Sequence, residues 1–190
     1  MAIHTDEQAT IWIGTDNDGL YAINDQGKQL HHYTHQAGIP NSVPNTILCI
    51  YEDSNRELWL GSYFDGLTRM NKQTGKCQDA TSLLQGNLST GKPKVSCITE
   101  DKEKNLWVGT YGSGLYKINL PTQHVTYYES TRNENDDWSI NRLPNDWISC
   151  LLEDKEGKLW IGTYKGLAVS TLKPTTSLNT KSRITSSPDT

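Results

Sequence analysis

Short apolar runs recur along this chain in a fixed order, and turn-forming residues separate them. Three runs carry apolar side chains on both faces, at Thr46–Tyr51, Val95–Thr99 and Trp147–Leu152. Short runs of this kind, bounded by Gly, Asn, Asp and Pro, indicate β-strands covered on both sides. Each run leads into an Asp, whose side chain can close a tight turn with the backbone two residues later. The pattern therefore predicts many short strands and no long helix.

A tryptophan marks the strand that follows each of these turns. Trp12, Trp59, Trp107 and Trp160 lie 47, 48 and 53 residues apart, and an Asp stands six residues before each of them. These aspartates are Asp6, Asp53, Asp101 and Asp154. A period of about 40–50 residues is typical of propeller blades and similar arrays. Because every unit repeats its tryptophan, we expect these side chains to be core.

Each unit reads as four strands, of which the first is the run described above. The second strand carries the Trp and a Gly that marks a close approach to the next sheet. The third follows a second Gly, and the fourth is the weakest. We expect the second strands at Ile11–Thr15, Leu58–Ser62, Leu106–Thr110 and Leu159–Thr163, the third at Leu20–Asn24, Leu67–Asn71, Leu115–Asn119 and Leu167–Leu172, and fourth strands at Leu30–Thr34 and Val125–Glu129.

The predicted fold is all-β, with about four blades of four antiparallel strands in residues 1–172. The chain starts within a repeat, which suggests a fragment, although a four-bladed ring could also close. Residues 173–190 are rich in Ser, Thr and Pro and have little to bury, which predicts a flexible linker or tail. Long polar connections at His35–Asn45, Thr81–Lys94 and Ser130–Asp146 should emerge on the same face as the turn before the third strand, where functional side chains gather.

Composition excludes several classes of function. The net charge is −4 with scattered Lys and Arg, which lacks the basic footprint of a nucleic-acid binder. No run of 18 apolar residues exists and the first residues do not read as a signal peptide. Cys49, Cys97 and Cys150 occupy one repeat position, each four residues before the Asp, so we expect buried, unbonded thiols and not a disulfide or zinc framework.

The repeat resembles the two-component regulator propeller repeat. The resemblance rests on the Glu-Asp ending of the first strand, on the LWVGT and LWIGT segments at Leu106 and Leu159, and on the Gly-Leu that opens the third strand. It implies β-propeller blades from the periplasmic sensor region of hybrid histidine kinases, many of which respond to oligosaccharides. Such sensors have two seven-bladed propellers, a β-sandwich, a membrane helix and a kinase core. Here there are about four blades, so the resemblance to larger rings implies an open arc from a bigger propeller. No kinase or receiver motif is present, so this chain cannot itself transfer phosphate.

Aromatic and acidic residues gather in the turns before the third strands, and they are the candidate ligand contacts. Sugar rings stack their apolar faces on aromatic side chains and pair their hydroxyls with Asp and Asn. The alternative is that the rings simply pack between blades. Trp147, beside the first strand of its unit, is expected to be core. The candidate set is Asp16, Asp18, Tyr63, Phe64, Asp65, Tyr111, Trp138 and Tyr164.

No catalytic residue, cofactor or metal site is predicted. His31 and His35 would share one strand face while His32 points away, so three converging ligands are not supplied. The Asp repeat differs from the sialidase Asp-box, whose Asp-to-Trp spacing is five, and nothing pairs two carboxylates among Asp18, Asp65 and Asp136.

The sequence thus favours a non-catalytic, periplasmic ligand-sensing fragment whose signal is an oligosaccharide. Its expected partners are the remaining blades and signalling domains of a parent sensor, and a second copy in a homodimer. A protein-interaction propeller is the alternative, and a propeller glycosidase or lyase is a third reading.

Overall fold

A computed structural model describes residues 1–36, 41–84, 91–130 and 143–171. Its described part is four antiparallel sheets and one short 3-10 helix, η1 (Thr81–Leu83). Three sheets have four strands and the fourth has three, each in sequence order. The predicted all-β propeller fold is thereby confirmed. The tail at 173–190 lies outside the described residues.

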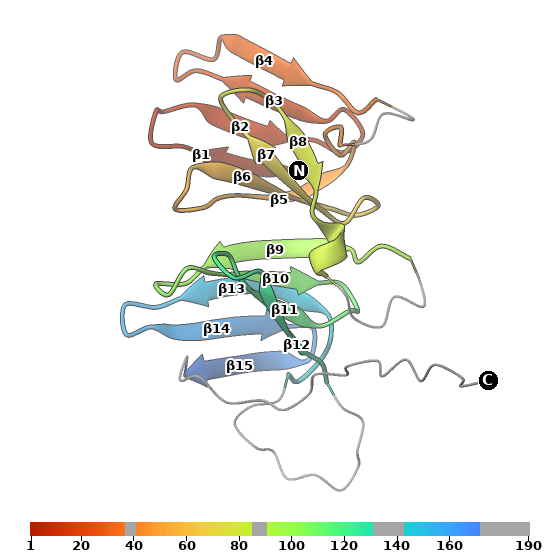
Figure 1. The fold of residues 1–190 in the computed structure, drawn as a ribbon, viewed down its shortest axis with the longest axis vertical. Coiled ribbons are helices and arrows are strands. Elements are labelled where there is room, and N and C mark those ends of the chain that lie inside the picture. Colours follow the sequence, from red (N-terminus) through yellow and green to blue (C-terminus); the bar gives the residue numbers. More distant parts are fainter. Residues whose placement is uncertain (37–40, 85–90, 131–142, 172–190) are drawn as a thin grey trace, which may run out of the picture.

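Each sheet is one blade. Blade 1 consists of β1 (Ala2–Thr5), β2 (Ile11–Gly14), β3 (Leu20–Ile23) and β4 (Gln29–Tyr33), and blade 2 of β5 (Ile47–Glu52), β6 (Glu57–Ser62), β7 (Leu67–Asn71) and β8 (Cys77–Asp79). Blade 3 consists of β9 (Val95–Glu100), β10 (Asn105–Thr110), β11 (Leu115–Asn119) and β12 (His124–Tyr128). Blade 4 has three strands, β13 (Ile148–Glu153), β14 (Lys158–Thr163) and β15 (Gly166–Thr171). The inner strands β1, β5, β9 and β13 neighbour one another, and the blades follow in order along an open arc (Figure 1).

The Asp of each repeat organises the turn between the first two strands. In blade 2, Asp53 Oδ1 accepts hydrogen bonds from the backbone N–H of Asn55 and Glu57 at 2.9 and 3.0 Å. Its Oδ2 accepts the indole Nε1–H of Trp59 at 2.9 Å. The same carboxylate-to-indole bond joins the Asp and Trp of the other three blades. The spacing of six residues is therefore the distance at which one carboxylate closes the turn and fixes the indole.

The turn also requires a left-handed residue before the Trp strand. Arg56 and Lys104 adopt φ of +65° and +66°, where Gly157 has +78°. Non-Gly residues in this region carry a steric penalty. The three bonds to the Asp hold the turn in this conformation.

Apolar side chains of neighbouring blades meet in three clusters, one at each junction. Trp12 and Leu20 of blade 1 pack with Ile47 of blade 2, and Trp59 packs with residues of blade 3. Trp107 packs with Ile148 and Ile161 of blade 4. These three tryptophans are 2–3% exposed, as expected for core. The core of the molecule is therefore a series of junctions and not one central cluster.

In the first three blades, the Gly two residues after the Trp allows the next blade to approach. A Cβ on Gly14 would lie 2.5 Å from Ile47 Cγ2, and one on Gly109 would lie 2.7 Å from Ile148 Cγ2. Real Cβ contacts are not this short, so these positions need glycine. The predicted close approach to the next sheet is confirmed for Gly14, Gly61 and Gly109, whereas a Cβ on Gly162 would meet Cys150 and Ser149 of its own blade.

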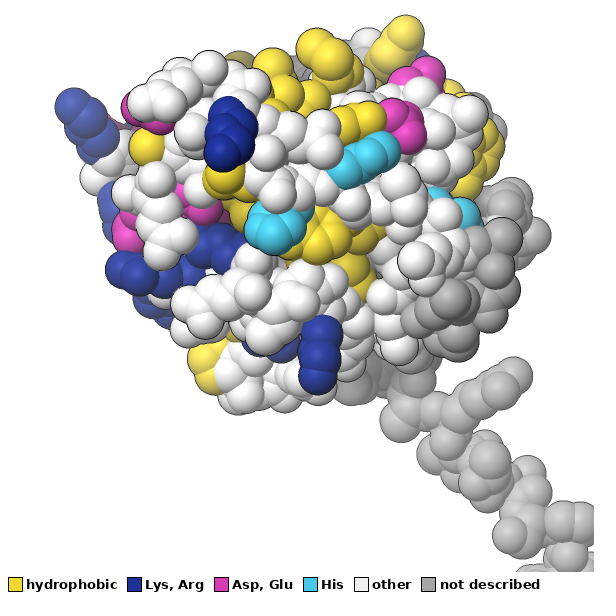
Figure 2. All heavy atoms as spheres, turned by 90° about the horizontal axis from the view of Figure 1, so that it is seen from above, with side chains coloured by type: hydrophobic (Ala, Val, Ile, Leu, Met, Phe, Trp, Pro, Cys, Tyr) yellow, Lys and Arg dark blue, Asp and Glu magenta, His cyan; other side chains and the backbone are white. Residues whose placement is uncertain are grey.

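Both ends of the arc leave apolar side chains in solvent. On blade 4, Leu152, Trp160 and Leu167 are 64%, 36% and 59% exposed, and on blade 1 Ile3 is 62% exposed. A view onto the blade 1 end shows hydrophobic side chains in patches among polar ones (Figure 2). The prediction that Trp160 is core is wrong, because within the described residues no blade packs against its face.

Several finer predictions also change. Trp147 is 48% exposed, so its assignment to the core is wrong; it precedes β13 and sits beside a turn, where the strand pattern no longer applies. Blade 2 has an outer strand, β8, that the sequence did not show. Cys49 and Cys97 are partly buried and unbonded, and burial raises the pKa of the Cys97 thiol to about 12. Cys150 is exposed, for the same reason as Trp160.

Candidate functional site

The turn before each third strand meets the start of the next blade's inner strand. The backbone N–H groups of Gly112 and Gly114 donate to the carbonyl oxygen of Asp146 at 3.0 and 3.1 Å. In blade 1, Asn17 and Gly19 donate in the same way to Asn45. The described last residues of these two long connections, Asn45 and Asp146, therefore lie on one face with the turns, as predicted. We call it the loop face.

At the junction of blades 3 and 4, three aromatic side chains form a cluster on the loop face. Tyr111 and Trp147 are bridged through their backbones, and their ring centroids are 5.8 Å apart. Trp147 and Tyr164 meet edge to face at 5.9 Å. Trp147 is 48% and Tyr164 79% exposed. The cluster thus offers accessible ring surface. Of the two residues before Trp147, Asn145 accepts the Trp147 N–H at 3.0 Å, and the Asp146 carboxylate accepts the Ser130 hydroxyl at 2.7 Å.

At the junction of blades 2 and 3, an amine faces the corresponding tyrosine. Lys94 Nζ donates to the Tyr63 hydroxyl at 3.0 Å and lies 4.3 Å from the ring centroid, a cation–π distance. Phe64 packs edge-on to Tyr63 at 4.8 Å and is 67% exposed. Asp65 approaches Ser62 Oγ at 3.4 Å. This junction therefore combines one apolar ring exposed to solvent with two charged side chains, Lys94 and Asp65, that already have partners.

Blade 1 contributes only polar groups to the loop face. Thr46 donates its hydroxyl to Asp16 Oδ1 at 3.4 Å, and the two residues also form a backbone bridge. Lys94 and Trp147 hold the repeat position of Thr46 at the later junctions. Asp18 accepts the hydroxyl of Tyr21 at 2.5 Å and lies 3.5 Å from His32 Nε2. Both carboxylates have local partners.

The structure brings Tyr111 and Tyr164 together and adds Trp147, which sequence reasoning had placed in the core. Tyr63, Phe64 and Asp65 lie one junction away, and Asp16 and Asp18 two junctions away. Trp138 lies outside the described residues. The signal for Trp147 was its repeat position, which is shared with Thr46 and Lys94 and is too variable to be core.

The histidines do not form a metal centre in the described part of the chain. His32 stacks on Tyr21 at 3.8 Å, while His31 lies against Tyr33 at 5.6 Å. Among the described residues, no three His, Cys, Asp or Glu side chains are placed to hold a metal ion.

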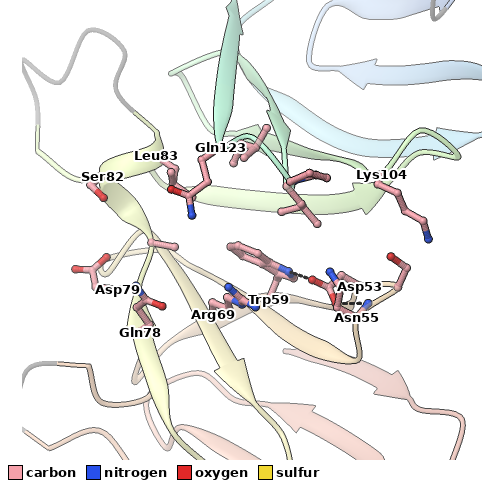
Figure 3. A pocket seen from close by; sticks show the side chains of 15 residues that line it. Asp53, Asn55, Trp59, Arg69, Gln78, Asp79, Ser82, Leu83, Lys104 and Gln123 are labelled. Atoms are coloured by element: carbon pink, nitrogen blue, oxygen red, sulfur yellow. Dashed lines mark hydrogen bonds between the residues drawn. The ribbon is translucent and has the colours of Figure 1, made fainter.

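A separate cleft of about 520 Å³ lies between blades 2 and 3 (Figure 3). Trp59 and Arg69 of blade 2 face it, with Lys104 and the β11–β12 turn of blade 3 on the other side. The guanidinium carbon of Arg69 lies 5.9 Å from the Trp59 ring centroid. Sequence reasoning missed this cleft, because it depends on how residues of one blade face those of the next.

The comparisons with known proteins agree with this geometry. Residues 41–64, 91–112 and 142–165 match the family model "Two component regulator propeller". These segments carry the Asp turns and Trp strands of blades 2, 3 and 4. The resemblance predicted from the sequence is confirmed. No curated protein matches the sequence.

Solved structures extend the likeness to nearly the whole chain. The extracellular domain of the putative hybrid two component system BT3049 from B. thetaiotaomicron is 26% identical, with a TM-score of 0.69 over 90% of this chain. The corresponding domain of BT4673 from the same organism is 22% identical, with a TM-score of 0.57 over 89% of this chain. The chain spans 22% and 26% of these two structures. A streptogramin B lyase structure, at 14% identity and TM-score 0.59 over 90% of this chain and 54% of its own, shares the fold alone.

The chain is therefore a set of propeller blades related to the sensor regions of hybrid two-component systems. Within the described residues, no helix is long and apolar enough to cross a membrane.

Proposed function

We propose that these blades are a non-catalytic, periplasmic part of a hybrid two-component sensor, and that the loop face binds an oligosaccharide. The observation that carries the proposal is the exposed cluster of Tyr111, Trp147 and Tyr164. Aromatic faces stack on sugar rings, and the side-chain N–H₂ group of the neighbouring Asn145 can donate to hydroxyls. The likeness to extracellular domains of hybrid systems supports the location.

Signalling would follow from differential binding. A ligand that prefers one arrangement of the blades shifts the sensor toward that arrangement, by no more than its difference in affinity. The further blades and signalling domains of a parent sensor, and a homodimer of it, would transmit the change.

The first experiment is a thermal melt of the 190-residue protein with a panel of neutral oligosaccharides. We expect one class to raise the melting temperature, and Trp147→Ala to abolish the rise. Trp160→Ala is the matched control, because it also removes an exposed indole but lies on the free face of blade 4. A rise that survives Trp147→Ala would place the ligand elsewhere.

A protein partner is the second candidate, and the exposed ring of Phe64 favours it. If the protein melts cooperatively and no sugar changes its melting temperature, the result would support a protein partner instead. An enzyme has less support: Asp18 and Asp65 lie on different blades, and each is bonded within its own turn.

A further inference from the structure

We propose that the cleft between blades 2 and 3 binds a small organic carboxylate with an apolar body, and that Arg69 is its anchor. This site is distinct from the loop face: it is lined by the Asp53 turn, the outer part of blade 2 and the β11–β12 turn (Figure 3).

The acidic side chains that line the cleft already have partners. Asp53 accepts the Trp59 indole and two backbone N–H groups. Asp79 accepts the backbone N–H of Thr81 at 2.8 Å and pairs with Lys92 at 3.2 Å. Asp79 is thus paired with a lysine, and both oxygens of Asp53 are occupied by hydrogen-bond donors.

The basic side chains are not neutralised to the same degree. Arg69 Nε is buried and forms an ion pair with the Glu57 carboxylate at 3.4 Å, but the guanidinium makes no hydrogen bond within the described structure, and its side chain is 41% exposed. Lys104 has no acidic side chain paired with it among the described residues. The guanidinium therefore keeps N–H groups that can donate to a ligand with acceptor oxygens. The planar guanidinium of arginine suits a carboxylate in particular.

Comparison with the previous junction explains why the cleft exists. Between blades 1 and 2, Lys72 crosses to Asp6 of the preceding blade and bonds it at 3.0 Å. The same repeat position in blade 3 is Leu120, which faces Asp53 across the cleft. Leucine is shorter than lysine and cannot bond the carboxylate. The space beside the Asp turn that an ammonium fills at one junction therefore has a leucine at the next.

The remaining walls suit an apolar body. Ala80, Leu83, Ile118, Leu120 and Pro121 also line the cleft, between its polar and charged side chains. A volume of about 520 Å³ falls in the range of small-molecule sites. A carboxylate on a short aliphatic or aromatic chain would place its charge at Arg69 and its body against these side chains.

The test is a titration of the 190-residue protein with phenylpropionate and with hexanoate, followed by NMR of the six indole N–H signals. We expect the Trp59 signal to shift with both acids at millimolar concentration. Phenylpropionamide, which has the same body without the charge, should shift it at least about tenfold more weakly.

Two variants and a control locate the site. Arg69→Gln should weaken binding at least about tenfold. Leu120→Lys restores the residue type that fills the equivalent space between blades 1 and 2, so it should remove binding without removing any cation. Lys117→Gln is the matched control: Lys117 holds the Arg69 position in blade 3, with its Nζ 5.2 Å from the Trp107 ring centroid, and should leave binding unchanged.

The outcomes separate cleanly. The proposal is wrong if Trp59 does not respond to either acid, if the amide acts equally, or if a folded Leu120→Lys variant binds as the parent does. Should Arg69→Gln fail to fold, Leu120→Lys and the amide together decide the result.

Discussion

Trp107 and Trp160 hold the same position in successive blades, yet one is 2% exposed and the other 36%. Within their blades they are alike, since each indole donates to its Asp at 2.8 Å. The difference lies in what covers them. Trp107 packs against blade 4, whereas the equivalent face of blade 4 has no neighbour in the described structure. Local hydrogen bonds therefore set the geometry of a blade, and the next blade sets its burial.

The leucines that open the third strands repeat this contrast. Leu115 is 1% exposed and Leu167 is 59% exposed, although both pair normally within their sheets. A repeat unit cannot bury its own apolar face, and its stability is the sum of an intrinsic term and a term for each junction. Blade 4 has one junction, and blades 2 and 3 have two.

The largest expected difference is in the cost of removing the tryptophans. Trp107→Ala should lower the free energy of unfolding by about 3–5 kcal/mol, because it opens a cavity in a packed junction. Trp160→Ala should cost about 1 kcal/mol, because the side chain is already partly in solvent. Denaturant unfolding of both variants measures the two values. Equal costs would show that the face of blade 4 is covered in solution.

The sequence predicted what lies within a blade better than what lies between blades. The Asp-to-Trp spacing fixed the turn, because Asp53 and Trp59 are joined by bonds inside one repeat. The exposure of Trp160 and the cleft beside Leu120 depend on which residue of the next blade faces them. The prediction that Trp147 is core was wrong for a related reason, because this residue precedes a strand and contacts the turn of the preceding blade. The loop-face residues were identified as a class, but their grouping required the order of blades in space.

A smaller difference should separate two lysine ion pairs. Lys72 contacts Asp6 and Glu52 at 3.0 and 2.6 Å, with its side chain 5% exposed. Lys72→Met should cost about 3 kcal/mol, because it leaves two buried carboxylates without their cation. Lys158 pairs with Glu156 at 2.6 Å on blade 4, where both are exposed, and Lys158→Met should cost less than about 1 kcal/mol. Denaturant unfolding of both variants measures the two losses in the free energy of unfolding. A small loss for Lys72→Met would mean that water replaces the ammonium.

The smallest expected difference is in acid sensitivity, between Asp6 inside a junction and Asp154 on the free edge. Burial alone raises the pKa of Asp6, but hydrogen bonds from Trp12, Lys72 and the backbone outweigh it and lower the pKa from 3.8 to about 2. A lowered pKa in the folded state stabilises the protein above the unfolded pKa, and this contribution is lost as the pH falls from about 4 to about 2. For Asp6 we expect a loss of about 1–2 kcal/mol over that interval.

The bond from Trp160 also lowers the pKa of Asp154, with the same sign, but its exposed position weakens the contribution. Unfolding free energies measured across this pH range for Asp6→Asn and Asp154→Asn test the comparison. Asp6→Asn should flatten the acid slope distinctly more than Asp154→Asn does. The indole and backbone bonds are common to both aspartates, whereas only Asp6 receives a lysine from the next blade. If the two variants flatten the acid slope equally, the turn alone sets the acid sensitivity and the junction adds nothing.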